Sequence, residues 1–93
     1  MQISKENYDI RNKIFEFEKR TDEMHQDFYK YVNGIEQKMP DWEGLERDMI
    51  LFSRKKIFDL GLSKNLDRVL YKFQNRKKIW LAWAEDWHHG KKK

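Results

Sequence analysis

The stretch that decides the fold is SKNLDRVLYKFQNRKKIWLAWAEDWHH, which spans residues 63–89. Its apolar residues recur at alternating steps of four and three, which places them on one face of a helix. They are Leu66, Leu70, Phe73, Trp80, Ala84 and Trp87, with Lys77 at the one gap in the pattern. The outer face carries a row of cations that we call the basic ridge: Lys64, Arg68, Lys72, Arg76, Lys77 and Lys78. Such a helix buries one face and presents a basic face to solvent or to a partner.

The composition predicts an all-α fold. One proline and four glycines in 93 residues leave few breaks in helices, and no strand pattern competes. Six Phe, four Tyr and four Trp provide large apolar areas for a core, although 39% of the residues are charged. We therefore expect residues 1–93 to form one helical-bundle domain, with residues 90–93 as a disordered basic tail.

Two further helices are predicted before this one. The first spans residues 5–38, with Ser4 as N-cap, Asn33-Gly34 as a weak point and Pro40 as its stop. Its apolar face, in steps of four and three, contains Ile10, Ile14, Phe17, Thr21, Met24, Phe28, Tyr31 and Ile35. The second spans residues 42–60, with Asp41 as N-cap and with apolar positions at Trp42, Leu45, Met49, Phe52, Ile57 and Leu60. Gly61 suits a C-cap and Ser63 an N-cap, so short turns predict an up-down-up bundle.

The predicted lengths do not match. A helix over residues 5–38 is about 50 Å long and one over 42–60 only about 29 Å, so Ile10, Ile14 and Phe17 would lack a cover. One solution is a break near Thr21 that gives four helices. The other is a second chain, and the unbroken periodicity across Thr21 favours a continuous helix in a homodimer.

Catalytic and metal sites lack the residues they need. Histidine occurs only at positions 25, 88 and 89, and the hydroxyl side chains besides Tyr are Ser4, Thr21, Ser53 and Ser63. No nucleophile with a nearby base and no glycine-rich phosphate loop follows from these positions. Asp22/His25, Glu85/His88 and Asp86/His89 have the spacing of helical metal ligands, but we interpret them as solvated polar pairs. We expect no enzyme activity, no cofactor and no metal.

The location is expected to be cytoplasmic. The chain has no cysteine, which fits a reducing compartment. Residues 1–7 have no apolar core of a secretory signal, and the longest apolar run, residues 79–84, is far shorter than the ~20 residues of a membrane span.

The charges are segregated along the chain. Residues 1–53 carry 8 basic and 12 acidic side chains, net −4, while residues 54–78 carry 9 and 2, net +7. Residues 57–65, IFDLGLSKN, resemble a DNA-binding helix-turn-helix, with Lys64, Asn65 and Arg68 as base readers and Arg54, Lys55 and Lys56 on phosphate. The same cations could instead follow a phosphate backbone without base readout, or form a solvated face neutralised by acids of the first helix.

Tryptophans mark a second candidate surface. Trp80 and Trp87 belong to the apolar face, and Trp83 points partly away from it. Because Trp83 and Trp87 lie near the end of the helix, they are good anchors for a protein partner. We therefore expect a non-catalytic interaction module in which Trp83 and Trp87 dock a protein and the basic ridge meets an acidic surface. The alternative is a nucleic-acid-binding protein that uses the basic ridge.

Overall fold

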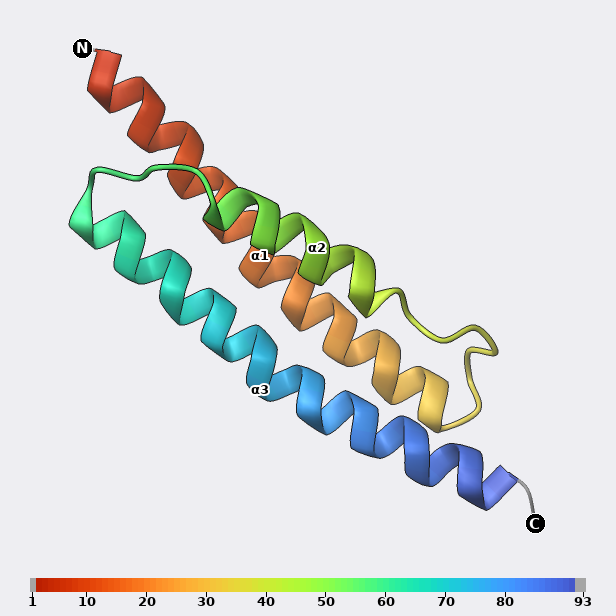
Figure 1. Cartoon of the computed structure of the whole chain (residues 1–93). Coiled ribbons are helices and arrows are strands. Elements are labelled where there is room, and N and C mark those ends of the chain that lie inside the picture. Colours follow the sequence, from red (N-terminus) through yellow and green to blue (C-terminus); the bar gives the residue numbers. More distant parts are fainter. Residues whose placement is uncertain (1, 92–93) are drawn as a thin grey trace.

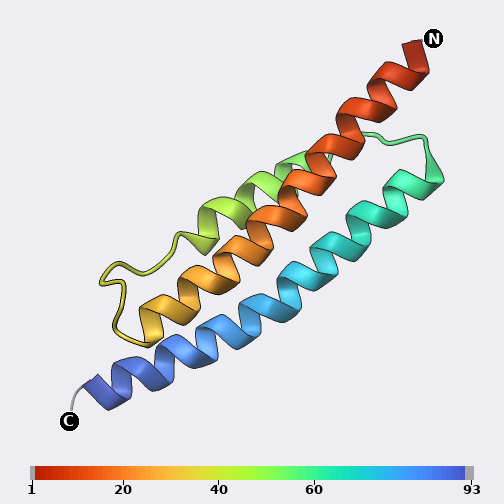
Figure 2. The ribbon, with the colours of Figure 1, turned by 180° about the vertical axis from the view of Figure 1, so that it is seen from behind.

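The computed structural model describes the backbone of residues 2–91 and the side chains of residues 5–90. It contains three helices, α1 (Gln2–Val32), α2 (Trp42–Ser53) and α3 (Leu60–Lys91), and no strand in the described part. Helices α1 and α3 run side by side in the same direction, while α2 runs back against both (Figure 1, Figure 2). The predicted all-α, up-down-up bundle is confirmed, and it forms a rod of 60 × 18 × 16 Å.

The core consists of the apolar faces that the periodicity predicts. On α1, the six buried residues are Ile10, Ile14, Phe17, Thr21, Phe28 and Tyr31, and Met24 packs partly buried against them. On α3, Leu66, Phe73, Trp80 and Ala84 are buried, and the pattern missed Leu62 and Val69. On α2, Leu45 and Met49 are buried. Every described residue of the predicted first face except Ile35 therefore contributes to the core.

Helix α1 is continuous through Thr21, so the four-helix alternative is wrong. The Thr21 hydroxyl donates a hydrogen bond to the carbonyl oxygen of Phe17 at 2.9 Å. This bond lies within one helical turn and satisfies the only polar group of a fully buried side chain. Thr21 is thus a core residue within a helix and not the cap of a new one.

Helix α1 ends at Val32, six residues earlier than predicted. The end follows from Gly34, the one described residue with a positive φ, at 79°. This left-handed conformation lets the amide of Ile35 donate to the carbonyl of Lys30 at 2.9 Å, which caps the helix. Ile35 then lies outside the helix and is 66% exposed, contrary to its predicted place in the core.

The length mismatch is resolved by a non-helical linker, residues 54–59. Helix α2 ends at Ser53, where the Ser53 hydroxyl donates to the carbonyl of Ile50 at 2.6 Å. Arg54 and Lys55 still turn with α2, because their amides donate to the carbonyls of Leu51 and Phe52 at 3.3 and 3.0 Å. Residues 56–59 form no helical turn, and four residues in an open path can cover about 13 Å, against about 6 Å in a helix. The linker thereby carries the chain to the beginning of α1, where Asn7 Nδ2 donates to Asp59 Oδ2 at 3.4 Å. The prediction of a second helix reaching residue 60 is wrong, and Leu60 is 75% exposed.

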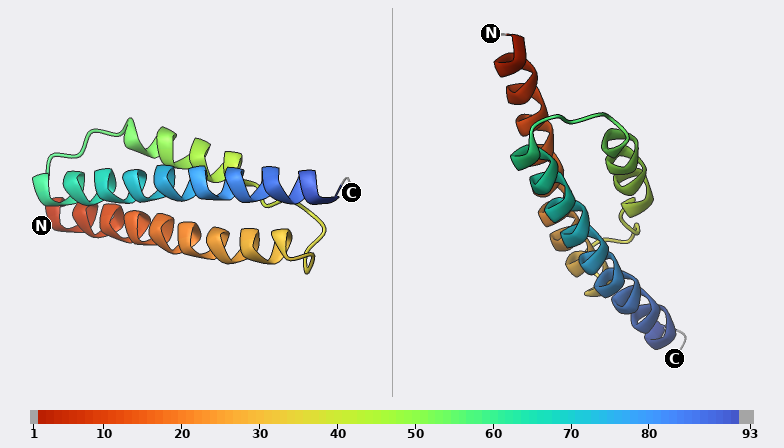
Figure 3. Two further views of the ribbon diagram at one scale, coloured as in Figure 1. Left: turned by 90° about the horizontal axis from the view of Figure 1, so that it is seen from below. Right: turned by 60° about the vertical axis from the view of Figure 1, so that its left-hand side comes forward.

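Because α3 starts beside residue 7, α1 and α3 lie against each other from there to the contact between Tyr31 and His88. Ile10, Ile14 and Phe17 are buried within one chain. Figure 3 shows α1 and α3 as two parallel rods of similar length, with α2 and the linker on top. The mismatch that motivated a homodimer is therefore absent.

The predicted caps at Gly61 and Ser63 are also wrong, because Asp59 caps α3. Its Oδ1 accepts from the amide of Leu62 at 3.0 Å, and its carbonyl accepts from the amide of Ser63 at 2.9 Å. Asp41 caps α2 as predicted, accepting from the amide of Gly44 at 3.0 Å. Ser4 lies inside α1, not before it.

At the other end, α3 continues through Gly90 to Lys91, so the first two of the four residues expected in a tail are helical, and residues 92 and 93 lie outside the described part. None of the helices in residues 2–91 is long and apolar enough to cross a membrane.

Candidate functional site

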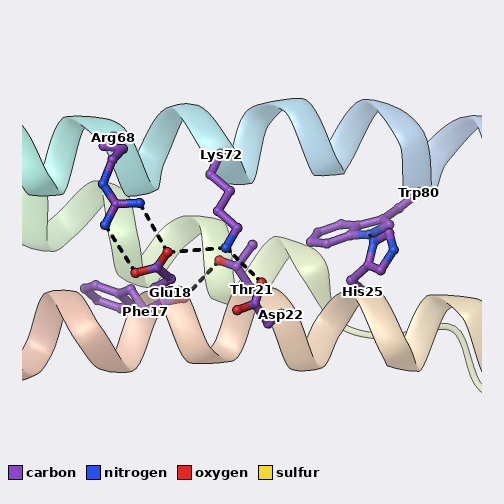
Figure 4. A network of polar contacts seen from close by, with 8 residues as sticks. All are labelled: Phe17, Glu18, Thr21, Asp22, His25, Arg68, Lys72 and Trp80. Atoms are coloured by element: carbon purple, nitrogen blue, oxygen red, sulfur yellow. Dashed lines mark hydrogen bonds and ion pairs between the residues drawn. The ribbon is translucent and has the colours of Figure 1, made fainter.

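The centre of the basic ridge is paired with acids of α1. Arg68 donates two hydrogen bonds to Glu18, at 3.2 and 3.3 Å, in a bidentate pair (Figure 4). Lys72 reaches Glu18 at 3.3 Å and Asp22 at 2.9 Å. The hydrogen bond from Arg68 lowers the pKa of Glu18, against the opposing effect of burial. The hydrogen bond to Asp22 raises the pKa of Lys72. Two of the six ridge cations are thus neutralised within the chain.

A third ridge cation, Lys77, joins α3 to α2. Its ammonium lies 2.9 Å from Glu46, which also accepts from Gln74 at 2.9 Å, and 4.9 Å from the centre of the Trp42 ring. The hydrogen bond from Lys77 lowers the pKa of Glu46. The remaining ridge cations are Lys64 and Lys78, which are exposed, and Arg76, which is half-buried. The ridge is therefore a structural ion-pair face over much of its length.

The residues assigned to helix-turn-helix readout do not adopt that geometry. Such a motif joins its helices by a turn of about 3–4 residues, whereas the linker here has six. The base reader Arg68 is engaged with Glu18, and Asn65 lines a small hollow of about 100 Å³ beside Phe15. No tight turn therefore presents the start of α3 to a major groove.

The three linker cations lie apart from the acids of α1. Arg54, Lys55 and Lys56 are all exposed, and none forms an ion pair with another described residue. The ammonium of Lys55 lies 5.9 Å from the ring of Phe52, and that of Lys56 lies 5.7 Å from the ring of Phe58.

Trp80 is the centre of an aromatic cluster that sequence reasoning only partly found. Its fully buried ring stacks on Phe28 at 5.2 Å and meets the edge of Phe73 at 5.7 Å. Its Nε1 donates to His25 Nδ1 at 3.0 Å (Figure 4), which requires an unprotonated Nδ1. Burial lowers the pKa of His25, and Arg76 adds to this while Asp22 opposes it. His25 is therefore a half-buried acceptor that holds the indole of Trp80.

The other two histidines also have structural partners. His88 Nε2 lies 2.7 Å from the hydroxyl of Tyr31, and His89 lies 3.7 Å from Glu85 on the same helix. Within the described residues, no three or more His, Asp and Glu side chains gather as a metal site.

Trp83 and Trp87 are half-buried at the end of the rod where α1 stops. The Trp83 ring lies 5.2 Å from that of His25, and the Trp87 ring packs against Gly34. Between α1 and α3 the two tryptophans line an open hollow of about 480 Å³, which we call the tryptophan hollow. Its lining is Tyr29, Val32, Asn33, Trp83, Asp86 and Trp87. A second hollow of about 450 Å³ lies on the other side of Trp87, beside Tyr31, Gly34, Glu36 and Gln37.

The structure thus brings Trp83 and Trp87 together in one concave surface. It divides the predicted cations between ion pairs with α1 and α2, exposed positions on α3, and the linker.

Comparisons with protein families, curated proteins and solved structures find no match for this chain.

Proposed function

We propose that this protein is a non-catalytic interaction module that docks a short apolar segment of a protein partner in the tryptophan hollow. The observation that carries the proposal is the placement of Trp83 and Trp87, half-buried, around a concavity of about 480 Å³. Large aromatic side chains with a fixed orientation are the commonest hot spots of protein interfaces, because they bury much area and lose little entropy.

The hollow is pre-organised by contacts beneath it. Trp83 is supported by His25, whose Nδ1 is in turn held by the buried Trp80. Trp87 is supported by Gly34 at the end of α1. Because these contacts exist before a partner arrives, docking costs little rearrangement of the chain.

The charge at this end indicates the chemistry of the partner. Asp86 lines the tryptophan hollow, and Glu36 lines the neighbouring one. Both side chains are exposed. A partner segment with apolar residues and one cationic side chain therefore complements this surface better than an acidic segment does.

The test uses fluorescein-labelled helical peptides with leucines at steps of three and four and with either arginine or glutamate beside them. We expect anisotropy to show binding of the arginine peptide, and Trp83→Ala or Trp87→Ala to weaken it by about 30-fold. Asp86→Lys should shift the preference to the glutamate peptide. Tyr71→Ala is the matched control, since Tyr71 is an aromatic residue of α3 that is 70% exposed. If neither peptide binds, or if the tryptophan variants bind like the control, the proposed function is wrong.

The alternative, nucleic-acid binding through the basic ridge, has less support because Arg68, Lys72 and Lys77 are already paired. It is tested by titrating labelled duplex DNA, single-stranded DNA and RNA at about 50 and 200 mM salt. Tight, salt-sensitive binding that Lys64→Glu and Lys78→Glu abolish would favour this alternative.

A homodimer and a cytoplasmic location remain predictions of the same proposal. The dimer is no longer needed to cover α1, and light scattering at micromolar concentration tests it directly.

A further inference from the structure

The linker between α2 and α3 and the residues that flank it carry exposed apolar and exposed cationic side chains. Phe58 is 81% exposed and Leu60 is 75% exposed, the two largest exposures among the described large apolar residues. Leu51, in the last turn of α2, is 55% exposed. Exposed apolar side chains that cluster in one segment, unlike those scattered singly, indicate a contact surface.

The exposure of Phe58 follows from how the linker is held. Ile57 packs against the core, and Asp59 is fixed by the amide of Leu62 and by Asn7. In an extended chain, alternate side chains point to opposite sides. Because Ile57 points inward, its neighbours Lys56 and Phe58 point outward, and the cation–π contact of 5.7 Å between them shows that they share a side.

The charge of this segment is positive. Residues 51–64 carry four cations, Arg54, Lys55, Lys56 and Lys64, and one carboxylate, Asp59, which gives a net charge of +3. The carboxylate is occupied by the cap of α3. Among the residues whose side chains the structure describes, no acid of α1 forms an ion pair with the three linker cations, in contrast to the centre of the basic ridge.

We propose that the linker, together with the flanking residues Leu51 and Leu60, is a peripheral membrane-binding site for anionic lipid. A bilayer surface offers anionic headgroups directly above apolar chains, so it satisfies Arg54, Lys55 and Lys56 while it buries Phe58 and Leu60. A nucleic acid complements only part of this surface, because Phe58 can stack on a base but Leu51 and Leu60 cannot. The exposed side chains of Phe58 and Leu60 can enter a bilayer surface without a preformed pocket to receive them.

The site lies at the end of the rod where α3 begins, whereas Trp83 and Trp87 lie near the end of α3 (Figure 1, Figure 3). The proposal therefore does not rest on the proposed function.

The experiment is flotation of the full chain with vesicles of phosphatidylcholine alone and with about 30% phosphatidylserine, at about 50 and 200 mM salt. We expect binding only to the anionic vesicles, weaker at the higher salt. Phe58→Ser/Leu60→Ser should weaken binding by at least about tenfold through the lost apolar burial. Lys55→Glu/Lys56→Glu should also weaken it by at least about tenfold.

Two matched controls are available on α3. Tyr71→Ser removes an aromatic side chain that is 70% exposed, and Lys78→Glu reverses an exposed cation, so neither should alter vesicle binding. All variants should melt within about 3 °C of the parent chain, because the substituted side chains are exposed.

Three results would overturn the proposal. The first is no flotation with anionic vesicles at the lower salt. The second is flotation that Phe58→Ser/Leu60→Ser leaves unchanged, which would indicate electrostatic adsorption alone. The third is loss of oligonucleotide binding, but not of vesicle binding, in the linker variants, which would assign the linker to nucleic acid.

Discussion

The hydrogen bond from Trp80 to His25 provides the sharpest test of how the aromatic core is packed. Trp80→Phe keeps an aromatic ring in the stack on Phe28 but removes the donor. The imidazole Nδ1 is then left without a partner in a half-buried position, which costs about 1–3 kcal/mol. The void left by the smaller ring adds roughly 1 kcal/mol at about 24 cal/mol per Å³. We therefore expect the free energy of unfolding to fall by about 2–4 kcal/mol, a large part of the roughly 5–14 kcal/mol typical of a 93-residue domain.

The size of the hydrogen-bond contribution follows from a double-mutant cycle with His25→Leu. When both polar partners are replaced by apolar groups, no buried group is left unsatisfied, so the double variant should be more stable than the sum of the two single changes predicts. Urea denaturation followed by circular dichroism measures all four proteins. A coupling free energy of about 1 kcal/mol or more is expected, and a value below about 0.3 kcal/mol would refute the reasoning.

Three further predictions concern pH, an ion-pair centre and a turn. Burial lowers the pKa of His25 below its usual 6.5, so the unfolded chain binds a proton at this residue before the folded chain does as the pH falls. The contribution of His25 to the unfolding free energy should therefore be constant above pH 6.5 and should decrease from pH 6.5 down to the lowered pKa. Denaturation between about pH 7.5 and 5 measures this slope, which His25→Leu should remove. Glu18→Gln should cost only about 1 kcal/mol, because the cluster with its two cationic partners is partly exposed and screened, and salt above about 0.5 M should reduce the difference in urea midpoint. Gly34→Ala should destabilise the chain by about 1 kcal/mol in thermal denaturation, since its φ of 79° is unfavourable for a residue with a Cβ, while Gly90→Ala, which meets nothing within 4 Å, serves as the control.

The sequence identified the residues of the candidate site, but it did not show which side chains these residues contact in the folded chain. The apolar phase along α3 placed Trp80 and Trp87 on the apolar face and Trp83 beside it, because side-chain direction on a helix follows from position alone. Trp80 is buried as predicted, while Trp83 and Trp87 are both half-buried. The basic ridge was equally visible. The ion pairs of Arg68 and Lys72 with acids of α1 were not visible, because they depend on which helix lies beside α3 and in which register.

The linker is the clearest limit of sequence reasoning. Helical periodicity extends past Ser53 to Ile57 and Leu60, so the pattern predicts a helix to residue 60. The structure instead ends α2 at Ser53 and leaves residues 54–59 as a linker, which brings Asp59 to Asn7 and lets α3 cover the apolar face of α1. The gain comes from burial of residues far away in the sequence, which no local pattern records.

The sequence by itself determined that this chain is helical and which faces of its helices are apolar, and it favoured a first helix that continues through Thr21. These properties depend on contacts a few residues apart, and such contacts are visible as periodicity. Only the tertiary structure decided the register of α1 against α3, the pairing of Arg68 and Lys72 with Glu18, and the exposure of Phe58 on the linker. These depend on how many residues leave the helix between α2 and α3, a choice set by the total apolar area that the whole chain buries.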